Sequence, residues 1–208
     1  IFDDQLSEED IEKLVNYGIP VSVIGREIEK ENVASIPLDY VSSIKTAVNN
    51  HFANGNEPII FLHLNNGSAM MENLENVARN EAIKLGKGDL FSTLTVEDSY
   101  SKTYEQFLKY FVDHKKGCFI TPRDSISCGV TNAAIFNKIN IPQDVQILSV
   151  IGTKYSKIVR PSLTSCDIDM YEVGSIGMRM LTKLLNGTLK NKVYPFVSTI
   201  EKRESTRV

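Results

Sequence analysis

The sequence lacks the features that mark several large classes of protein. No run approaches the roughly 18 consecutive apolar residues of a membrane-spanning helix, so we expect no association with a membrane. The formal net charge is −3, and no lysine/arginine block forms a basic tail for nucleic acid. The cysteines have no Cys-x-x-Cys spacing, which predicts buried thiols in a reducing, cytoplasmic compartment and neither disulfides nor a zinc site. They are Cys118, Cys128 and Cys166.

Motifs for catalysis and for cofactor binding are also scarce. The sequence contains no G-x-S-x-G elbow for a nucleophilic serine. Gly86-Lys87-Gly88 lacks the spacing of a phosphate-binding P-loop. The three histidines, His51, His63 and His114, lie far apart and form no metal-binding pattern. We therefore expect no enzyme, no cofactor and no metal site, and we expect the function to be binding.

What the sequence does contain is a regular alternation of strand-like and helix-like segments. Apolar runs such as 59–64 and 145–151 are typical of parallel strands covered on both faces. The alternation predicts an α/β fold, a parallel sheet with helices on both faces. The expected strands are 19–24, 35–38, 59–64, 90–96, 118–120 and 145–151, and the main helices are 7–18, 41–54, 70–85, 104–111, 124–137 and 170–185.

Local residues suggest where some of these elements begin and end. We expect Asp39 and Asp124 to cap the helices that follow them, and 121–123 to form a turn. In open α/β sheets the ligand site lies beyond the carboxyl ends of the strands. Those positions here include 25–26, 63–68, 123–124 and 151–153.

The segment 159–187 contains the most pronounced amphipathic helix. Asp169 is expected to cap it, Glu172 has the capping-box spacing, and Gly187 ends it. Its expected apolar side consists of Met170, Val173, Ile176, Gly177, Met180, Leu181 and Leu184. Its polar arc consists of Tyr171, Glu172, Ser175, Arg179 and Lys183. The arc is either an ordinary solvated face or a docking surface for an acidic partner, and the pattern alone leaves both open.

Five motifs together resemble LacI/GalR-type transcription regulators. They are GIPV at 18–21, the helix start at 124–129, IPQDV at 141–145, RPSLT at 160–164 and RESTR at 203–207. The resemblance implies a periplasmic-binding-protein-like fold, with two parallel-sheet α/β lobes joined by three crossovers and a small molecule in the cleft. The N-terminal lobe would comprise 1–38 and 166–194, and the C-terminal lobe 39–165 and 195–208.

The same resemblance implies a function and partners. The chain would bind an effector or corepressor for a homodimeric regulator of sugar or carbon metabolism that represses transcription. Helix 124–137 and the surface around Tyr155 would form part of the dimer interface. Because Ile1–Asp4 reads as the end of a buried strand, we expect further sequence upstream, including a helix-turn-helix head that binds operator DNA. The alternative is an extracytoplasmic solute-binding protein of a transporter, which shares the fold.

By the resemblance, five residues line the effector cleft: Arg26, Glu72, Arg123, Asp124 and Ile151. Sugar-binding members usually have an aspartate at the position of Ile151, an arginine near Glu72 and often an aspartate at Gly25. Sugars are held by bidentate hydrogen bonds to such side chains. These departures imply that the effector is not a free sugar held in the usual manner, and its identity stays open.

The amphipathic helix resembles that of the carbon-catabolite-control subfamily most closely. In that subfamily the helix docks the serine-phosphorylated form of the carrier protein HPr. The resemblance assigns this role to Tyr171, Glu172, Arg179 and Lys183. Thr199 stands where the subfamily supplies a further arginine, so one cation of the docking site is missing here.

Overall fold

The computed structural model describes residues 7–207 and divides them into two compact units. The smaller unit contains the described residues up to Asp39 together with Ile168–Ser198, and the larger unit contains the rest. The chain therefore passes from one unit to the other three times, after residues 39, 167 and 198. The boundaries expected from the sequence, after residues 38, 165 and 194, lie within a few residues of these. The strand end expected at Ile1–Asp4 lies outside the described residues.

The larger unit is built on a six-stranded sheet with the order β4-β3-β5-β6-β7-β9. All pairs in it are parallel except β7 with β9, which is antiparallel. Its strands are β3 (Ile59–Leu64), β4 (Phe91–Val96), β5 (Gly117–Arg123), β6 (Val145–Ile151), β7 (Thr164–Asp167) and β9 (Thr199–Glu201). Its helices are α2 (Val41–Asn54), α3 (Ala69–Lys84), the short η2 (Gly88–Leu90), α4 (Tyr100–Asp113), α5 (Asp124–Phe136) and α6 (Lys154–Ile158).

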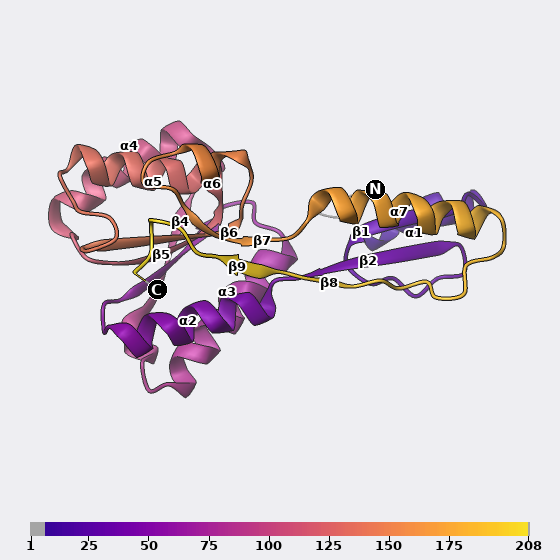
Figure 1. The fold of residues 1–208 in the computed structure, drawn as a ribbon, viewed down its shortest axis with the longest axis horizontal. Helices are drawn as coiled ribbons and strands as arrows, with labels where there is room; N and C mark the ends of the chain where they lie inside the picture. The colour runs from indigo at the N-terminus through magenta and orange to yellow at the C-terminus, as the bar shows by residue number, and fades with distance from the viewer. Residues whose placement is uncertain (1–6, 208) are drawn as a thin grey trace. The chain divides into compact units, whose positions relative to one another are not determined.

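Helices cover both faces of this sheet, with α4 and α5 on one and α2 and α3 on the other (Figure 1). On the first face Ile60, Leu62 and Phe119 pack against Phe107 of α4 and Val130 of α5. Alternate residues of the same strands, such as Ile59 and Phe61, are also completely buried. Strands buried on both faces require continuous apolar runs, which explains why the sequence pattern located them well. The predicted α/β fold with parallel sheets is confirmed.

The smaller unit is a three-stranded sheet with a helix on each face. Its strands, in the order β1-β2-β8, are β1 (Val21–Gly25), β2 (Val33–Asp39) and β8 (Phe196–Val197), and its helices are α1 (Glu8–Asn16) and α7 (Met170–Leu185). Val21, Val23 and Val33 pack against α1. Ile24, Ala34 and Ile36 pack against Val173 and Met180 of α7. This alternation is the side-chain period of two along a strand.

Helix α7 begins and ends as the sequence predicts. The Asp169 side chain accepts hydrogen bonds from the backbone N–H groups of Tyr171 and Glu172, each at 3.0 Å. Gly187 takes the left-handed conformation, with φ of 65°. Met170 is an exception to the expected apolar side, because its side chain is 42% exposed at the first helical position.

Three other local predictions are wrong. Asp39 does not cap α2; it is the last residue of β2, and Tyr40 occupies the N-cap position. Residues 121–123 form no turn, because β5 continues through Pro122 to Arg123. Pro122 is tolerated there because the pairing of β5 with β3 ends at Ile120, so the missing N–H has no ladder partner on that side. Asp124 is the first residue of α5 and not its cap.

The two most specific motifs of the resemblance contact one another. The Glu204 carboxylate accepts hydrogen bonds from the backbone N–H and the hydroxyl of Ser162, at 2.7 and 2.8 Å. The Ser205 hydroxyl accepts one from the backbone N–H of Thr164 at 2.8 Å. RPSLT and RESTR thus form one hydrogen-bonded structure, although about 40 residues separate them in sequence. Within residues 7–207, no helix is long and apolar enough to cross a membrane.

Candidate functional site

The order of the strands in the larger unit defines a place where a ligand can bind. After β3 the chain moves to β4 on one side, and it then returns to β5 on the other side of β3. The connections that leave β3 and β5 therefore diverge, toward α3 on one face and α5 on the other (Figure 1). In open α/β sheets this divergence leaves a crevice at the carboxyl ends of the strands, which is the usual ligand site.

Both helices that begin at this crevice lack a side-chain cap. The N-cap residues, Ser68 of α3 and Arg123 of α5, accept no hydrogen bond from the first turn through their side chains. Helix α2 also lacks a side-chain cap, whereas α1, α4, α6 and α7 each have one. The first N–H groups of an α-helix have no partner within the helix, so uncapped ends can donate to a ligand.

The predicted cleft residues of the larger unit lie along this edge of the sheet. Arg123 and Ile151 are register partners at the ends of β5 and β6. The Arg123 guanidinium lies 3.4 Å from the Asp98 carboxylate, which follows β4, and both side chains are more than a third exposed. Glu72 is exposed in the first turn of α3. The edge therefore carries the positive charge of Arg123 and the negative charges of Asp98 and Glu72, together with the apolar side chain of Ile151.

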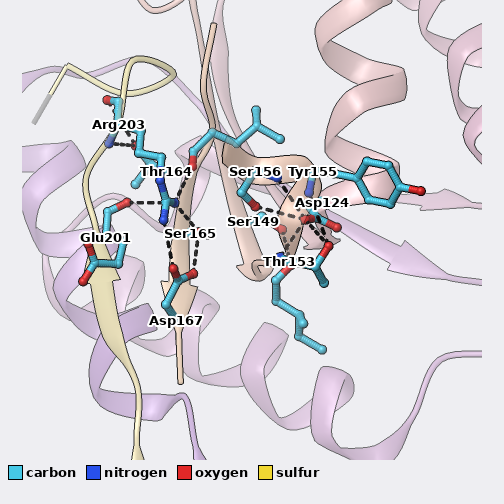
Figure 2. A network of polar contacts seen from close by, with 12 residues as sticks. Asp124, Ser149, Thr153, Tyr155, Ser156, Thr164, Ser165, Asp167, Glu201 and Arg203 are labelled. Atoms are coloured by element: carbon cyan, nitrogen blue, oxygen red, sulfur yellow. Dashed lines mark hydrogen bonds and ion pairs between the residues drawn. The ribbon is translucent and has the colours of Figure 1, made fainter. Parts of the chain in front are cut away.

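Asp124 lies at the same edge, but its side chain forms hydrogen bonds with the neighbouring loop. One carboxylate oxygen, Oδ2, accepts from the backbone N–H and hydroxyl of Thr153 at 2.6 and 2.7 Å, and from those of Ser156, both at 3.1 Å (Figure 2). The side chain is buried, with 2% of the residue exposed. Asp124 therefore fixes the loop that follows β6 to the start of α5, which makes it a positioning residue of the edge.

A second carboxylate lies against the other side of this loop. Asp167 accepts from the Arg203 guanidinium at 2.9 Å and from the Ser165 hydroxyl at 2.6 Å (Figure 2). A Cβ atom on Gly152 would lie 2.3 Å from an Asp167 carboxylate oxygen and 2.4 Å from the Ser165 hydroxyl, so this position requires glycine. The loop 151–156 is thus packed between Asp124 and the end of β7, the strand that leads to a crossover.

Sequence reasoning missed these supporting contacts because the partners are distant in the chain. Asp124 and Thr153 are separated by 29 residues, and Asp167 and Arg203 by 36. The RESTR motif is a family signature in the sequence, but the motif alone assigns no structural role to Arg203. The remaining predicted cleft residue, Arg26, follows β1 at the carboxyl end of the small sheet and is half-buried in the smaller unit.

The four predicted docking residues are all exposed on α7. Tyr171 is 89% exposed, and Glu172, Arg179 and Lys183 also face solvent. Arg179 and Lys183 line a groove of about 480 Å³ that the segment after α7 completes. The same helix packs its other side on the small sheet, so the exposed arc is presented by a fixed element.

All three cysteine thiols have raised pKa values. Burial raises the pKa of the Cys118 and Cys166 thiols to about 12 and that of Cys128 to about 11, so all three stay protonated at neutral pH. Cys118 and Cys166 are buried as predicted, whereas Cys128 is half-buried. In the part of the chain that the structure describes, no group of three His, Cys, Asp or Glu residues could hold a metal ion.

Comparison with known proteins agrees with this architecture. The chain matches the periplasmic binding protein-like domain family over residues 71–206. It is 29% identical over 213 residues to catabolite control protein A of Priestia megaterium, covering 97% of this chain and 62% of that protein. It is 28% identical over 186 residues to catabolite control protein A of Staphylococcus epidermidis, covering 86% of this chain and 54% of that protein. The chain thus spans less than two thirds of the length of these relatives.

Solved structures share the fold at lower identity. Transcription regulator CcpA of Lactococcus lactis aligns with a TM-score of 0.79 at 19% identity, over 99% of this chain and 76% of that one. A LacI family regulator from Enterococcus faecium with bound ribose gives 0.83 at 18% identity, over 96% and 75%. One from Arthrobacter sp. FB24 in complex with lactose gives 0.78 at 20%, over 90% and 70%.

The fold, the site at the sheet edge and the family match define a class: the chain belongs to the periplasmic-binding-protein-like domain family. Within that class, the similarity to effector-binding domains of LacI/GalR-type regulators, expected from the signature motifs, is confirmed by these relatives.

Proposed function

We propose that the chain is the effector-binding and dimerisation domain of a cytoplasmic LacI-type regulator that represses genes of sugar or carbon metabolism. The observation that carries the proposal is the match to catabolite control protein A, which spans 97% of this chain. The intact regulator would bind operator DNA through a helix-turn-helix segment outside these 208 residues. Effector binding would shift the equilibrium between two arrangements of the domain and thereby change the affinity for DNA.

Exposed apolar side chains on neighbouring elements of the larger unit support the dimer. Phe136 and Ile135 at the end of α5 are 69% and 49% exposed, and Ile158 and Tyr155 of α6 are 64% and 44% exposed. Helices α5 and α6 contact one another. Large exposed apolar side chains are common in protein–protein interfaces. This is the surface to which the family resemblance assigns the dimer contact.

The chemistry of the sheet edge indicates the kind of effector. The uncapped N-termini of α3 and α5 offer hydrogen-bond donors, and Arg123 offers a cation. Ile151 offers no hydrogen bond where sugar-binding members have an aspartate. We therefore propose a metabolite with a carboxylate or phosphate group, and not a free sugar, although two structural neighbours carry lactose and ribose.

A thermal-shift panel on the intact protein tests this proposal. Common mono- and disaccharides should not raise the melting temperature, whereas at least one phosphorylated or carboxylated metabolite should. Arg123→Ala should abolish that shift. Arg160→Ala is the matched control, because the Arg160 guanidinium donates to the carbonyls of Lys157 and Val159 away from the edge. A clear shift with a neutral sugar would contradict the proposal, because it would show that the site binds sugars although Ile151 stands in place of an aspartate.

A second function, docking of a phosphorylated protein, is favoured by the exposed arc of α7. Arg179 and Lys183 are one helical turn apart, a spacing that lets both contact one phosphate group. We propose that Tyr171, Glu172, Arg179 and Lys183 bind the serine-phosphorylated form of HPr. Charge reversal at both Arg179 and Lys183 should abolish binding in calorimetry. If the unmutated protein does not bind phosphorylated HPr, this proposal is wrong.

A further inference from the structure

A ring of polar contacts joins the C-terminal tail to the interior of the larger unit. His51, in the last turn of α2, contacts the Glu57 carbonyl through Nε2 at 2.8 Å and the Gln146 side-chain nitrogen through Nδ1 at 3.3 Å. The Gln146 oxygen, Oε1, accepts a hydrogen bond from the backbone N–H of Arg207 at 2.9 Å. The Arg207 guanidinium pairs with the Glu57 carboxylate at 2.8 Å, which closes the ring. Neither function proposed above uses these four residues.

Two backbone groups decide which atoms of the ring carry hydrogen. The Glu57 carbonyl can only accept, so the Nε2 atom of His51 must carry a proton. The Arg207 backbone N–H can only donate, so the oxygen of the Gln146 amide must face it. The NH₂ group of that amide then faces His51 and donates to Nδ1. Only the neutral imidazole, with Nδ1 free of a proton, satisfies the whole ring.

A proton on Nδ1 is incompatible with this arrangement. It places an N–H of His51 opposite the NH₂ of Gln146, so that two donors meet without an acceptor. Turning the Gln146 amide over satisfies His51, but its NH₂ then faces the Arg207 N–H, which loses its acceptor. Charged His51 and the hydrogen bond to the Arg207 backbone therefore exclude one another.

The surroundings of the ring make this conflict consequential. His51 and Gln146 are buried, with 7% and 6% of each residue exposed, so opposed donors cannot simply turn to bulk water. A cavity of about 30 Å³ that His51, Gln146 and Thr206 help to line can hold a water molecule beside the charged imidazole. The ion pair of Arg207 with Glu57 is a weak restraint by comparison, because the two side chains are 31% and 24% exposed.

The tail before Arg207 is held independently of His51. The backbone N–H of Ser205 donates to the Ser162 carbonyl at 2.9 Å, and the Ser205 carbonyl accepts from the Ile147 N–H at 2.9 Å. Loss of the Gln146 acceptor therefore releases the chain at Arg207, while Ser205 stays in place.

We infer that His51 is a proton-operated latch for the end of the tail. Neutral His51 holds Arg207 in place through the Gln146 amide, and protonated His51 releases it. The device needs no ligand, and it is independent of both functions proposed above.

The other titratable groups that face His51 are the Glu57 carboxylate, the Arg207 guanidinium and the Cys118 thiol. Burial raises the pKa of Cys118 to about 12. Burial acts to raise the pKa of Glu57 as well, but the hydrogen bond from Arg207 and the neighbouring charges hold it below 4.5. Between about pH 5 and pH 7.5, His51 is therefore the group of this cluster that changes its charge.

The direction of the response follows from burial. Burial lowers the pKa of His51 below its ordinary 6.5, although the contacts with Glu57 act in the opposite direction. The latch is therefore closed at neutral pH and opens as the pH falls through the lowered value.

Hydrogen exchange of the intact, isotopically labelled protein tests the inference. After correction for the intrinsic exchange rate, the protection of the Arg207 amide should fall by up to about tenfold for each pH unit below the lowered pKa. The Ser205 amide is the internal control and should change much less. His51→Gln supplies a donor and an acceptor without a titratable proton, so it should keep Arg207 protected in acid. His63→Gln, which removes a histidine that pairs with Glu75 outside the ring, should leave the pH response unchanged.

Gln146→Glu distinguishes the latch from a general loosening of the protein in acid. The two oxygens of a carboxylate can accept from charged His51 and from the Arg207 N–H at the same time, so Arg207 should stay protected as the pH falls. The nitrogen resonances of His51 should also show the proton on Nε2 at neutral pH. The inference is wrong if Nδ1 carries that proton, or if Arg207 loses protection equally in the unmutated protein, His51→Gln and Gln146→Glu. It is also wrong if the unmutated protein loses no protection at Arg207 in acid.

Discussion

Replacing Asp124 tests how strongly one buried carboxylate fixes the candidate site. Its Oδ2 accepts four hydrogen bonds from Thr153 and Ser156. Asp124→Ala leaves all four donors without this acceptor. Thr153 is exposed, so its N–H and hydroxyl can turn to water. Ser156 is completely buried, and its two donors would remain unsatisfied.

Each buried donor without a partner costs about 1–3 kcal/mol, so the two donors of Ser156 should make Asp124→Ala lower the free energy of unfolding by roughly 2–6 kcal/mol. Asp124→Asn keeps an acceptor oxygen but loses the charge, and it should cost about 1–2 kcal/mol. Asp98→Asn is the control for charge, because its ion pair with Arg123 is solvent-exposed and contributes at most about 1 kcal/mol.

Urea unfolding followed by circular dichroism measures these differences, and hydrogen exchange locates them. The amides of Thr153 and Ser156 should exchange faster in Asp124→Ala, while amides in the middle of β3 should change less. A free energy of unfolding within 1 kcal/mol of the unmutated protein, with unchanged exchange at both amides, would refute the positioning role of Asp124.

Four other substitutions test separate parts of the structure. Gly152→Ala should destabilise the protein by about 1–3 kcal/mol in urea unfolding because its Cβ would collide with Asp167, whereas Gly174→Ala, with no atom within 4 Å, should stabilise α7 by about 0.5–1 kcal/mol. Burial lowers the pKa of His51 below its usual 6.5, so the unfolded chain binds its proton more readily and stability should fall as the pH drops through and below about 6.5. That loss, at most about 1.4 kcal/mol per pH unit, should disappear from the pH profile of His51→Gln. Phe136→Ser should weaken a dimer by about 10-fold or more in sedimentation velocity. An unchanged dimer would place the interface elsewhere.

The elements that were predicted correctly are those whose own residues indicate their structure, without knowledge of partners elsewhere in the chain. The strands 59–64 and 145–151 are mostly apolar because helices cover both faces, and their predicted bounds agree with the structure. Asp169 and Gly187 are local signals for the ends of α7, and both are confirmed. The prediction failed at Pro122, because whether a proline ends a strand depends on how far the neighbouring strand extends.

The candidate site could be predicted only in part. The edge of the sheet follows from the alternation of strands and helices, so Arg123 and Ile151 could be placed there from the sequence. The partners of Asp124 and Asp167 could not, because hydrogen bonds across 29 and 36 residues leave no local pattern.

Selection of genomic DNA by the intact protein tests the central claim most directly. A homodimeric LacI-type regulator should enrich fragments that contain an inverted repeat, because a two-fold symmetric protein reads two half-sites. Sequencing of the retained fragments should recover such a repeat near genes of carbon metabolism. Retention of no sequence above background, together with tight binding of a transported solute, would contradict the account and favour a solute-binding protein.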